Sequence, residues 1–158
     1  VDLYQVHRPD LFTHPDEVFA AFTNLRSRGL VREVGVSNYT LHQTTLLEAR
    51  LSFNLASVQP QYSAAHLEPL RDGTLDHCMK KSLVPLAWSP LAGGRIATGE
   101  GIRPALLAVL DELAARENVT RSAVAIASGG TSSSTFTSLI AASKIAAISC
   151  TVGNSVRM

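Results

Sequence analysis

The sequence has almost no excess of charge of either sign. Its 158 residues include 14 Lys and Arg against 13 Asp and Glu, a formal net charge of +1. Proteins dedicated to nucleic acids or anionic membranes normally carry a basic excess or patch, so this balance argues against both partners. With 46% hydrophobic and 17% charged residues, the composition predicts a folded chain with a buried core.

Cysteine is scarce as well. Cys78 and Cys150 lie far apart and form neither a CxxC pair nor a cluster with histidines. This pattern favours a reducing, cytoplasmic compartment and predicts no metal site. The N-terminal residues have no basic region before an apolar run, so no secretory signal is expected. No apolar run approaches the roughly 18 residues of a membrane span.

Short apolar segments alternate with helical segments along residues 1–127. Strand starts recur about every 23 to 31 residues, the size of a βα unit. This alternation predicts an α/β fold with parallel strands, either a doubly wound sheet or a (β/α) barrel. No G-x-G-x-x-G follows the first strand, which weakens a dinucleotide-binding Rossmann fold. The expected strands are Leu3–His7, Val34–Ser37, Ser57–Gln61 and Leu83–Trp88, and the expected helices begin at Pro15, Thr40, Thr74, Pro104 and Thr120.

Polar and aromatic residues follow the predicted strands. Because parallel strands place their carboxyl ends on one rim, where function gathers, these residues predict a site for a planar polar ligand. The residues are His7, Ser37, Asn38, Gln59 and Trp88.

Each of these residues also has a structural alternative. His7 would be a hydrogen-bonded strand end, Ser37 and Asn38 the start of a turn, Gln59 a partner for loop backbone, and Trp88 part of the core. The glycine-rich segment Gly93–Arg95 would be a flexible loop, or Arg95 would meet a phosphate. The coincidence of the rim residues in successive units favours a site.

Four segments, in order, resemble the aldo-keto reductases. Asp2–Pro9 (DLYQVHRP) resembles the fourth strand of that family, Val34–Tyr39 (VGVSNY) its fifth, and Val58–Ser63 (VQPQYS) its sixth. Pro85–Gly94 (PLAWSPLAGG) resembles the seventh. With Asp72–Asp76 (DGTLD), the sequence is most similar to the bacterial and fungal branch of uncharacterised oxidoreductases.

This resemblance implies an incomplete (β/α)8 TIM barrel that holds strands four to seven over residues 1–127. It implies an NADPH-dependent reductase of small aldehydes or ketones. Of the family's catalytic Asp, Tyr, Lys and His, only the His maps here, onto His7, where it would orient and polarise the carbonyl.

The resemblance also implies the cofactor contacts. Ser37, Asn38 and Gln59 would hold the nicotinamide carboxamide, and Trp88 would stack on the nicotinamide ring. Ser89 and Leu91 would contact the pyrophosphate, and the loop from Gly93 to Arg95 would fold over it.

The length of the chain, 158 residues, leaves alternative functions open. A barrel of this kind needs about 250 residues, so we expect the chain to begin inside a larger domain, about three βα units from its start. Alternatively the chain is a catalytically inactive half-barrel that binds a nucleotide or a partner chain, or self-associates through the exposed edge at Leu3–His7. A third hypothesis is a different barrel enzyme that uses the same rim for another planar ligand.

Residues 128–158 differ in composition from the preceding chain and are expected to form a divergent Ser/Thr/Ala-rich C-terminal segment. One interpretation places an eighth strand near Ile145–Val152. Thr151, Gly153, Asn154 and Arg157 would then be remnants of an adenosine phosphate site. The other interpretation is an aberrant reading frame or a misjoined exon.

Overall fold

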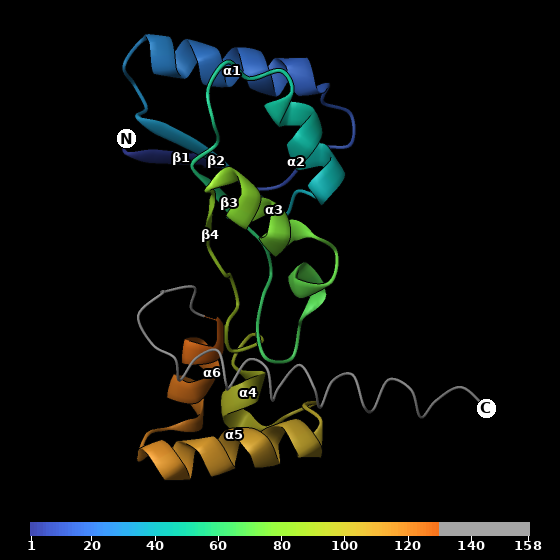
Figure 1. Ribbon diagram of the computed structural model, residues 1–158, viewed down its shortest axis with the longest axis vertical. Helices are drawn as coiled ribbons and strands as arrows, with labels where there is room; N and C mark the ends of the chain where they lie inside the picture. The colour runs from blue at the N-terminus through green and yellow to red at the C-terminus, as the bar shows by residue number, and fades with distance from the viewer. Residues whose placement is uncertain (130–158) are drawn as a thin grey trace, which may run out of the picture. The chain divides into compact units, whose positions relative to one another are not determined.

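The computed structural model describes residues 1–129, in which strands and helices alternate (Figure 1). The expected strand near Ile145–Val152 and the expected remnants Thr151, Gly153, Asn154 and Arg157 lie outside the described residues. So does the segment 128–158, apart from its first two residues, which end the last helix. The elements are β1 (Leu3–Val6), α1 (Pro15–Ser27), β2 (Glu33–Ser37), α2 (Leu41–Glu48), β3 (Ser57–Gln59), η1 (Glu68–Leu70), α3 (Thr74–Lys81), β4 (Val84–Pro85), α4 (Arg95–Thr98), α5 (Pro104–Glu117) and α6 (Arg121–Gly129).

The chain divides into two compact units, each with its own core. Val1–Pro60 and Pro69–Leu86 form the first unit, which holds the sheet and α1 to α3. Gln61–Glu68 and the described residues from Ala87 onward form the second unit, which holds α4 to α6. Within residues 1–129, no helix is both long and apolar enough to cross a membrane.

The sheet is parallel, and its four strands follow the chain order β1-β2-β3-β4. Sequential parallel strands joined by helices form the wall of a (β/α) barrel, whereas a doubly wound sheet reverses direction at a switch point. The observed order is therefore the barrel order. The third and fourth strands are shorter than expected, because Gln61 and Trp88 form only an isolated bridge beyond the sheet.

Side chains in β2 and β3 alternate between the two faces of the sheet. Val34, Val36 and Val58 are buried in the core of the first unit together with side chains from α1, α2 and α3: Phe22, Leu47 and Cys78. Burial and the Glu48 carboxylate raise the pKa of the Cys78 thiol, so this thiol is expected to be protonated and inert.

The opposite face of the sheet carries a layer of small and polar residues. Gln5, Gly35 and Ser57 are register partners on β1, β2 and β3. The Gln5 amide nitrogen donates to the Ser57 hydroxyl at 3.0 Å. This bond spans the middle strand, and it requires that the residue between its partners has no side chain.

Helix boundaries follow local capping chemistry. At α2 the Thr40 hydroxyl accepts from the Gln43 main-chain N–H at 3.2 Å, and the Gln43 side chain accepts from the Thr40 N–H at 2.9 Å, which confirms the predicted start. At α3, in contrast, the cap is Gly73 with φ +86°, and Thr74 is already helical.

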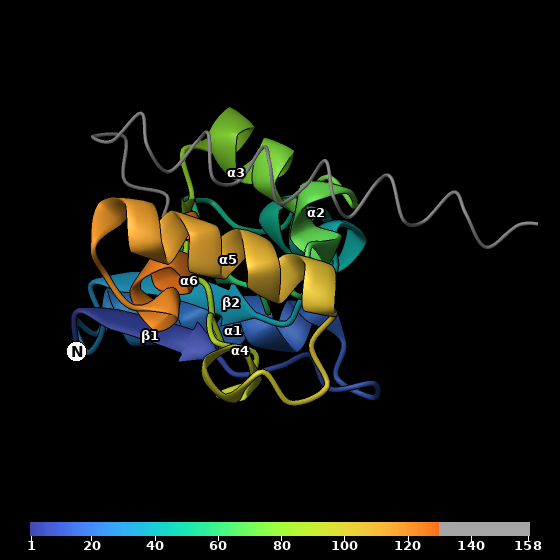
Figure 2. The ribbon, with the colours of Figure 1, turned by 90° about the horizontal axis from the view of Figure 1, so that it is seen from below.

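The second unit is a cluster of helices in which α5 and α6 pack side by side (Figures 1 and 2). Leu106, Leu110 and Leu113 on α5 are buried, as the helical period predicts. Arg121, the first residue of α6, makes a two-bond ion pair with Asp111 of α5 at 2.6 and 2.7 Å. This bond holds the pKa of the Asp111 carboxyl below its usual value.

We expect Gly35→Ala to destabilise the first unit by about 1–3 kcal/mol. A Cβ at position 35 would overlap the Ser57 hydroxyl and lie 2.8 Å from the Ser57 carbonyl oxygen. Urea unfolding of the wild type, Gly35→Ala, Ser57→Ala and the double variant measures the coupling. Ser57→Ala removes one of the two overlaps, so the double variant should lose less than the sum of the single losses; additive losses would contradict the proposed overlap.

The Asp111–Arg121 pair predicts a pH-dependent difference between the wild type and Asp111→Asn. The folded carboxyl has the lower pKa, so its contribution is complete above about pH 4, the ordinary value, and is lost as the pH falls through the folded pKa. Thermal unfolding should show a Tm difference at pH 7 that shrinks at pH 2 to 3 and in high salt. A Tm difference independent of pH would show that another effect of the substitution dominates.

Candidate functional site

Three of the predicted site residues come together in the first unit, where β2 and β3 end. Ser37 and Gln59 are register partners. The Ser37 side chain is buried, and its hydroxyl donates to the Gln59 carbonyl oxygen at 2.9 Å. The main-chain N–H of Asn38 donates to the same oxygen at 3.1 Å. One carbonyl at the end of β3 therefore fixes both residues at the end of β2.

Asn38 links three strand ends. Its side-chain nitrogen donates to the His7 carbonyl at 3.0 Å, beyond β1, and to the Ser37 hydroxyl at 3.1 Å. Its φ of +59° lies in the left-handed region, which Asn tolerates better than most residues. Both protons of this amide thus serve the fold. These contacts place Asn38 at the rim and join strand ends, and its role toward a ligand stays a prediction.

His7 and Gln59 retain side-chain groups for a ligand. Val6 pairs with Val36, so His7 is level with Ser37 and, through it, with Gln59. Strand alternation puts all three on the face that carries Gln5. His7 is exposed and Gln59 is half-buried, and neither side chain has a hydrogen-bond partner within residues 1–129. A primary amide donates and accepts, which matches a carboxamide.

Trp88 lies in the second unit, directly before Ser89. Its carbonyl oxygen accepts from the Tyr62 N–H at 3.3 Å, and 37% of the residue is exposed. Tyr62 itself is buried, and this burial raises the pKa of its phenol. Trp88 is thus only partly covered, and it offers aromatic surface to a planar ligand.

The segment after Trp88 forms a tight, internally bonded loop. Ser89, Ala92, Gly93 and Gly94 all have positive φ, between +53° and +90°. The Ser89 hydroxyl accepts from the Gly93 N–H at 2.8 Å, and its carbonyl accepts from the Ala92 N–H at 2.8 Å. These bonds give the segment a defined backbone shape.

Within this loop several donors remain available. The main-chain N–H groups of Leu91 and Arg95 reach no acceptor in the described part of the chain. The Arg95 Nε donates to the Ala92 carbonyl at 2.9 Å, which holds the exposed guanidinium at the loop. Main-chain N–H groups beside a guanidinium suit a phosphate oxygen.

The structure therefore places the predicted residues in two groups. His7, Ser37, Asn38 and Gln59 form a hydrogen-bonded rim in the first unit. The second unit holds the aromatic and loop residues: Trp88, Ser89, Leu91, Gly93 and Arg95. Their binding roles remain predictions, as does the absence of a metal; residues 1–129 contain no cluster of three or more potential metal ligands.

The sequential parallel sheet with polar residues at its strand ends defines a protein of the (β/α)-barrel class. The chain belongs to the aldo/keto reductase family, whose model matches residues 1–152. This match confirms the resemblance seen in the sequence. Members of this family are oxidoreductases.

Two relatives illustrate the match. A 6-dehydroglucose reductase from Novosphingobium aromaticivorans is 40% identical over 126 residues, which cover 79% of this chain and 41% of that protein. Oxidoreductase YdhF from Escherichia coli is 44% identical over 114 residues, covering 72% of this chain and 37% of that protein. The chain thus spans about two fifths of the length of these curated relatives.

The fold also resembles solved structures of aldo-keto reductases. The thermostable aldo-keto reductase Tm1743, solved with the inhibitor epalrestat, superimposes with a TM-score of 0.73 at 26% identity. The matched region covers 80% of this chain and 44% of that one. Together with the strand order, this likeness confirms the expected fold class.

We predict that Asn38→Ala destabilises the chain more than Asn38→Gly does. Both variants lose the side-chain bonds to His7 and Ser37, at about 1–2 kcal/mol, but only alanine is also strained at positive φ. Urea unfolding of the two variants separates the side-chain bonds from the backbone strain. Equal stability of both variants with the wild type would mean that the Asn38 bonds contribute nothing to stability.

Proposed function

We propose that this chain supplies the nicotinamide- and pyrophosphate-binding part of an NADPH-dependent aldo-keto reductase that converts aldehydes or ketones to alcohols. The observation that carries the proposal is the hydrogen-bonded rim of His7, Ser37, Asn38 and Gln59 in a chain of this family. The N–H groups of Leu91 and Arg95, which reach no acceptor within residues 1–129, support it independently.

The residues present fit the proposed cofactor. When bound, NADPH supplies the hydride that adds to the carbonyl carbon. Gln59 would bind the nicotinamide carboxamide through its side-chain amide, while Ser37 and Asn38 hold Gln59 and His7 in place. Trp88 would cover the nicotinamide ring. Ser89 and the N–H groups of Leu91 and Arg95 would bind the pyrophosphate, with the backbone shape of Gly93 keeping the loop compact.

His7 would act on the substrate. An imidazole N–H that donates to the carbonyl oxygen orients this group and stabilises the alkoxide that develops during reduction. Its exposed ring has no competing hydrogen bond within residues 1–129. The 40% sequence identity to a 6-dehydroglucose reductase makes the aldehyde of an oxidised sugar the first substrate to test.

A second candidate is favoured by the exposed edge of β1. Leu3 and Tyr4 on this strand are 36% and 46% exposed, and unpaired strand edges invite pairing with another chain. The chain would then be an inactive half-barrel that binds a nucleotide or a partner, including a second copy. Sedimentation of the 158-residue chain over a concentration series would show whether it self-associates.

NADPH titration with the 158-residue chain, followed by nucleotide fluorescence, tests the proposal. Gln59→Leu should weaken NADPH binding by about three- to tenfold, because the proposed contact between its amide and the carboxamide is lost. The same variant should bind 2′-phospho-ADP-ribose, which lacks the carboxamide, like the wild type. Arg95→Met should weaken both ligands, and Arg116→Met, which removes an exposed Arg paired with Glu117, should weaken neither.

The outcomes separate the candidates. If the wild type does not bind NADPH, the cofactor proposal is wrong. Equal losses of both ligands in Gln59→Leu would contradict the carboxamide role. Because the resemblance maps only His7 among the family's catalytic residues, we expect this chain to bind NADPH without reducing 6-dehydroglucose; measured reduction would overturn this expectation.

A further inference from the structure

The short helix α4 depends on a donor from outside itself. It has only four residues, Arg95–Thr98, and it directly follows the glycine-rich loop. A helix of one turn leaves most of its carbonyl oxygens without an intrahelical donor and is unstable alone. Something else in the second unit must therefore hold it.

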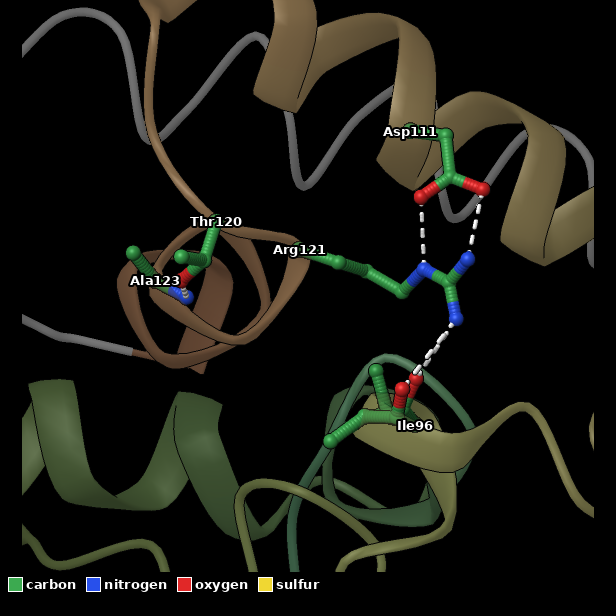
Figure 3. A network of polar contacts seen from close by, with 6 residues as sticks. Ile96, Asp111, Thr120, Arg121 and Ala123 are labelled. Carbon is green, nitrogen blue, oxygen red and sulfur yellow. Dashed lines mark hydrogen bonds and ion pairs between the residues drawn. The ribbon is translucent and has the colours of Figure 1, made fainter.

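Arg121 supplies that donor from the start of α6 (Figure 3). Its Nη1 donates to the carbonyl oxygens of Ile96 at 3.2 Å and Ala97 at 3.4 Å. The rest of its guanidinium, Nε and Nη2, binds both oxygens of Asp111 on α5. One planar group thus joins three helices, and each of its nitrogens is used.

The connection continues into the loop through Ile96. The Ile96 side chain is fully buried, and its main-chain N–H donates to the Leu91 carbonyl oxygen at 3.2 Å. The N–H of Leu91 itself reaches no acceptor within residues 1–129. Arg95, whose N–H likewise reaches no acceptor there, is the first residue of α4. A shift of α4 would therefore move both donors.

We propose that Arg121 is a positioning residue for the anion-binding loop Ser89–Arg95. It fixes α4, and through α4 it fixes the spacing of the Leu91 and Arg95 N–H groups that would receive the pyrophosphate of a dinucleotide. The ligand in this inference rests on the proposed function; the support of α4 by Arg121 does not. Asp111 orients the guanidinium, because a two-bond carboxylate contact leaves Nη1 aimed at α4.

A lysine cannot replace Arg121 in this arrangement. Its ammonium is a compact point charge, whereas the Arg fork binds a carboxylate and two carbonyls at once. Arg121→Lys therefore keeps the charge and loses the geometry. This substitution separates an electrostatic effect on an anionic ligand from a positioning effect on the loop.

The test compares wild type, Arg121→Met, Arg121→Lys and Asp111→Asn, with Arg116→Met as the control on α5. The first readout is the Kd for NADPH, which we expect to rise about three- to tenfold in Arg121→Met and by a smaller factor in Arg121→Lys and Asp111→Asn. The second readout needs no nucleotide. Trypsin cleavage after the exposed Arg95 should be faster in the Arg121 variants, because the loop opens more often.

The two readouts keep the inference distinct from the proposed function. If the wild type binds no NADPH, the cofactor proposal fails, and the cleavage rate after Arg95 alone decides the positioning role. If Arg121→Met behaves like Arg116→Met in both readouts, the inference is overturned. Should circular dichroism show that Arg121→Met is unfolded, Arg121→Lys and Asp111→Asn carry the comparison, and wild-type behaviour of both overturns it.

Discussion

The parallel register of β1, β2 and β3 is the constraint on which the candidate rim depends. Pairing Gln5 with Gly35 and Gly35 with Ser57 sets Ser37 opposite Gln59, and it brings the residue after β1 level with both. A slip of one residue would turn these polar side chains toward the valine core. Gly35 protects the register, since any larger side chain would collide with Ser57.

Residues at the rim divide the work between holding the strands together and meeting a ligand. Ser37 and Asn38 donate hydrogen bonds to carbonyl groups at neighbouring strand ends. The side chains of His7 and Gln59, in contrast, have no hydrogen-bond partner within residues 1–129. In the second unit the same division holds: Ser89 and Ala92 close the loop, and the N–H groups of Leu91 and Arg95 reach no acceptor among the described residues. Preorganised donors of this kind lose little entropy when a ligand binds.

Local patterns predicted the elements with strong period or capping signals. The capping pair of Thr40 and Gln43 and the apolar stripe of α5 are examples, because each depends on residues within one or two turns. The ends of β3 and β4 were not predictable in this way, since a strand ends where its neighbour stops offering partners. The Gly73 cap of α3 was missed because Thr74 has the commoner capping side chain.

By itself, the sequence determined the alternation of strands and helices, the family, and which residues stand at the strand ends. It could not show that Asn38 joins three strand ends, or that Arg121 supports the helix behind the glycine-rich loop. Asn38 and His7 lie 31 residues apart and Arg121 and Ile96 lie 25 apart, and nothing in the local pattern relates them. Only folding fixes their distances, because the packing of strands and helices brings together residues that are far apart in the sequence.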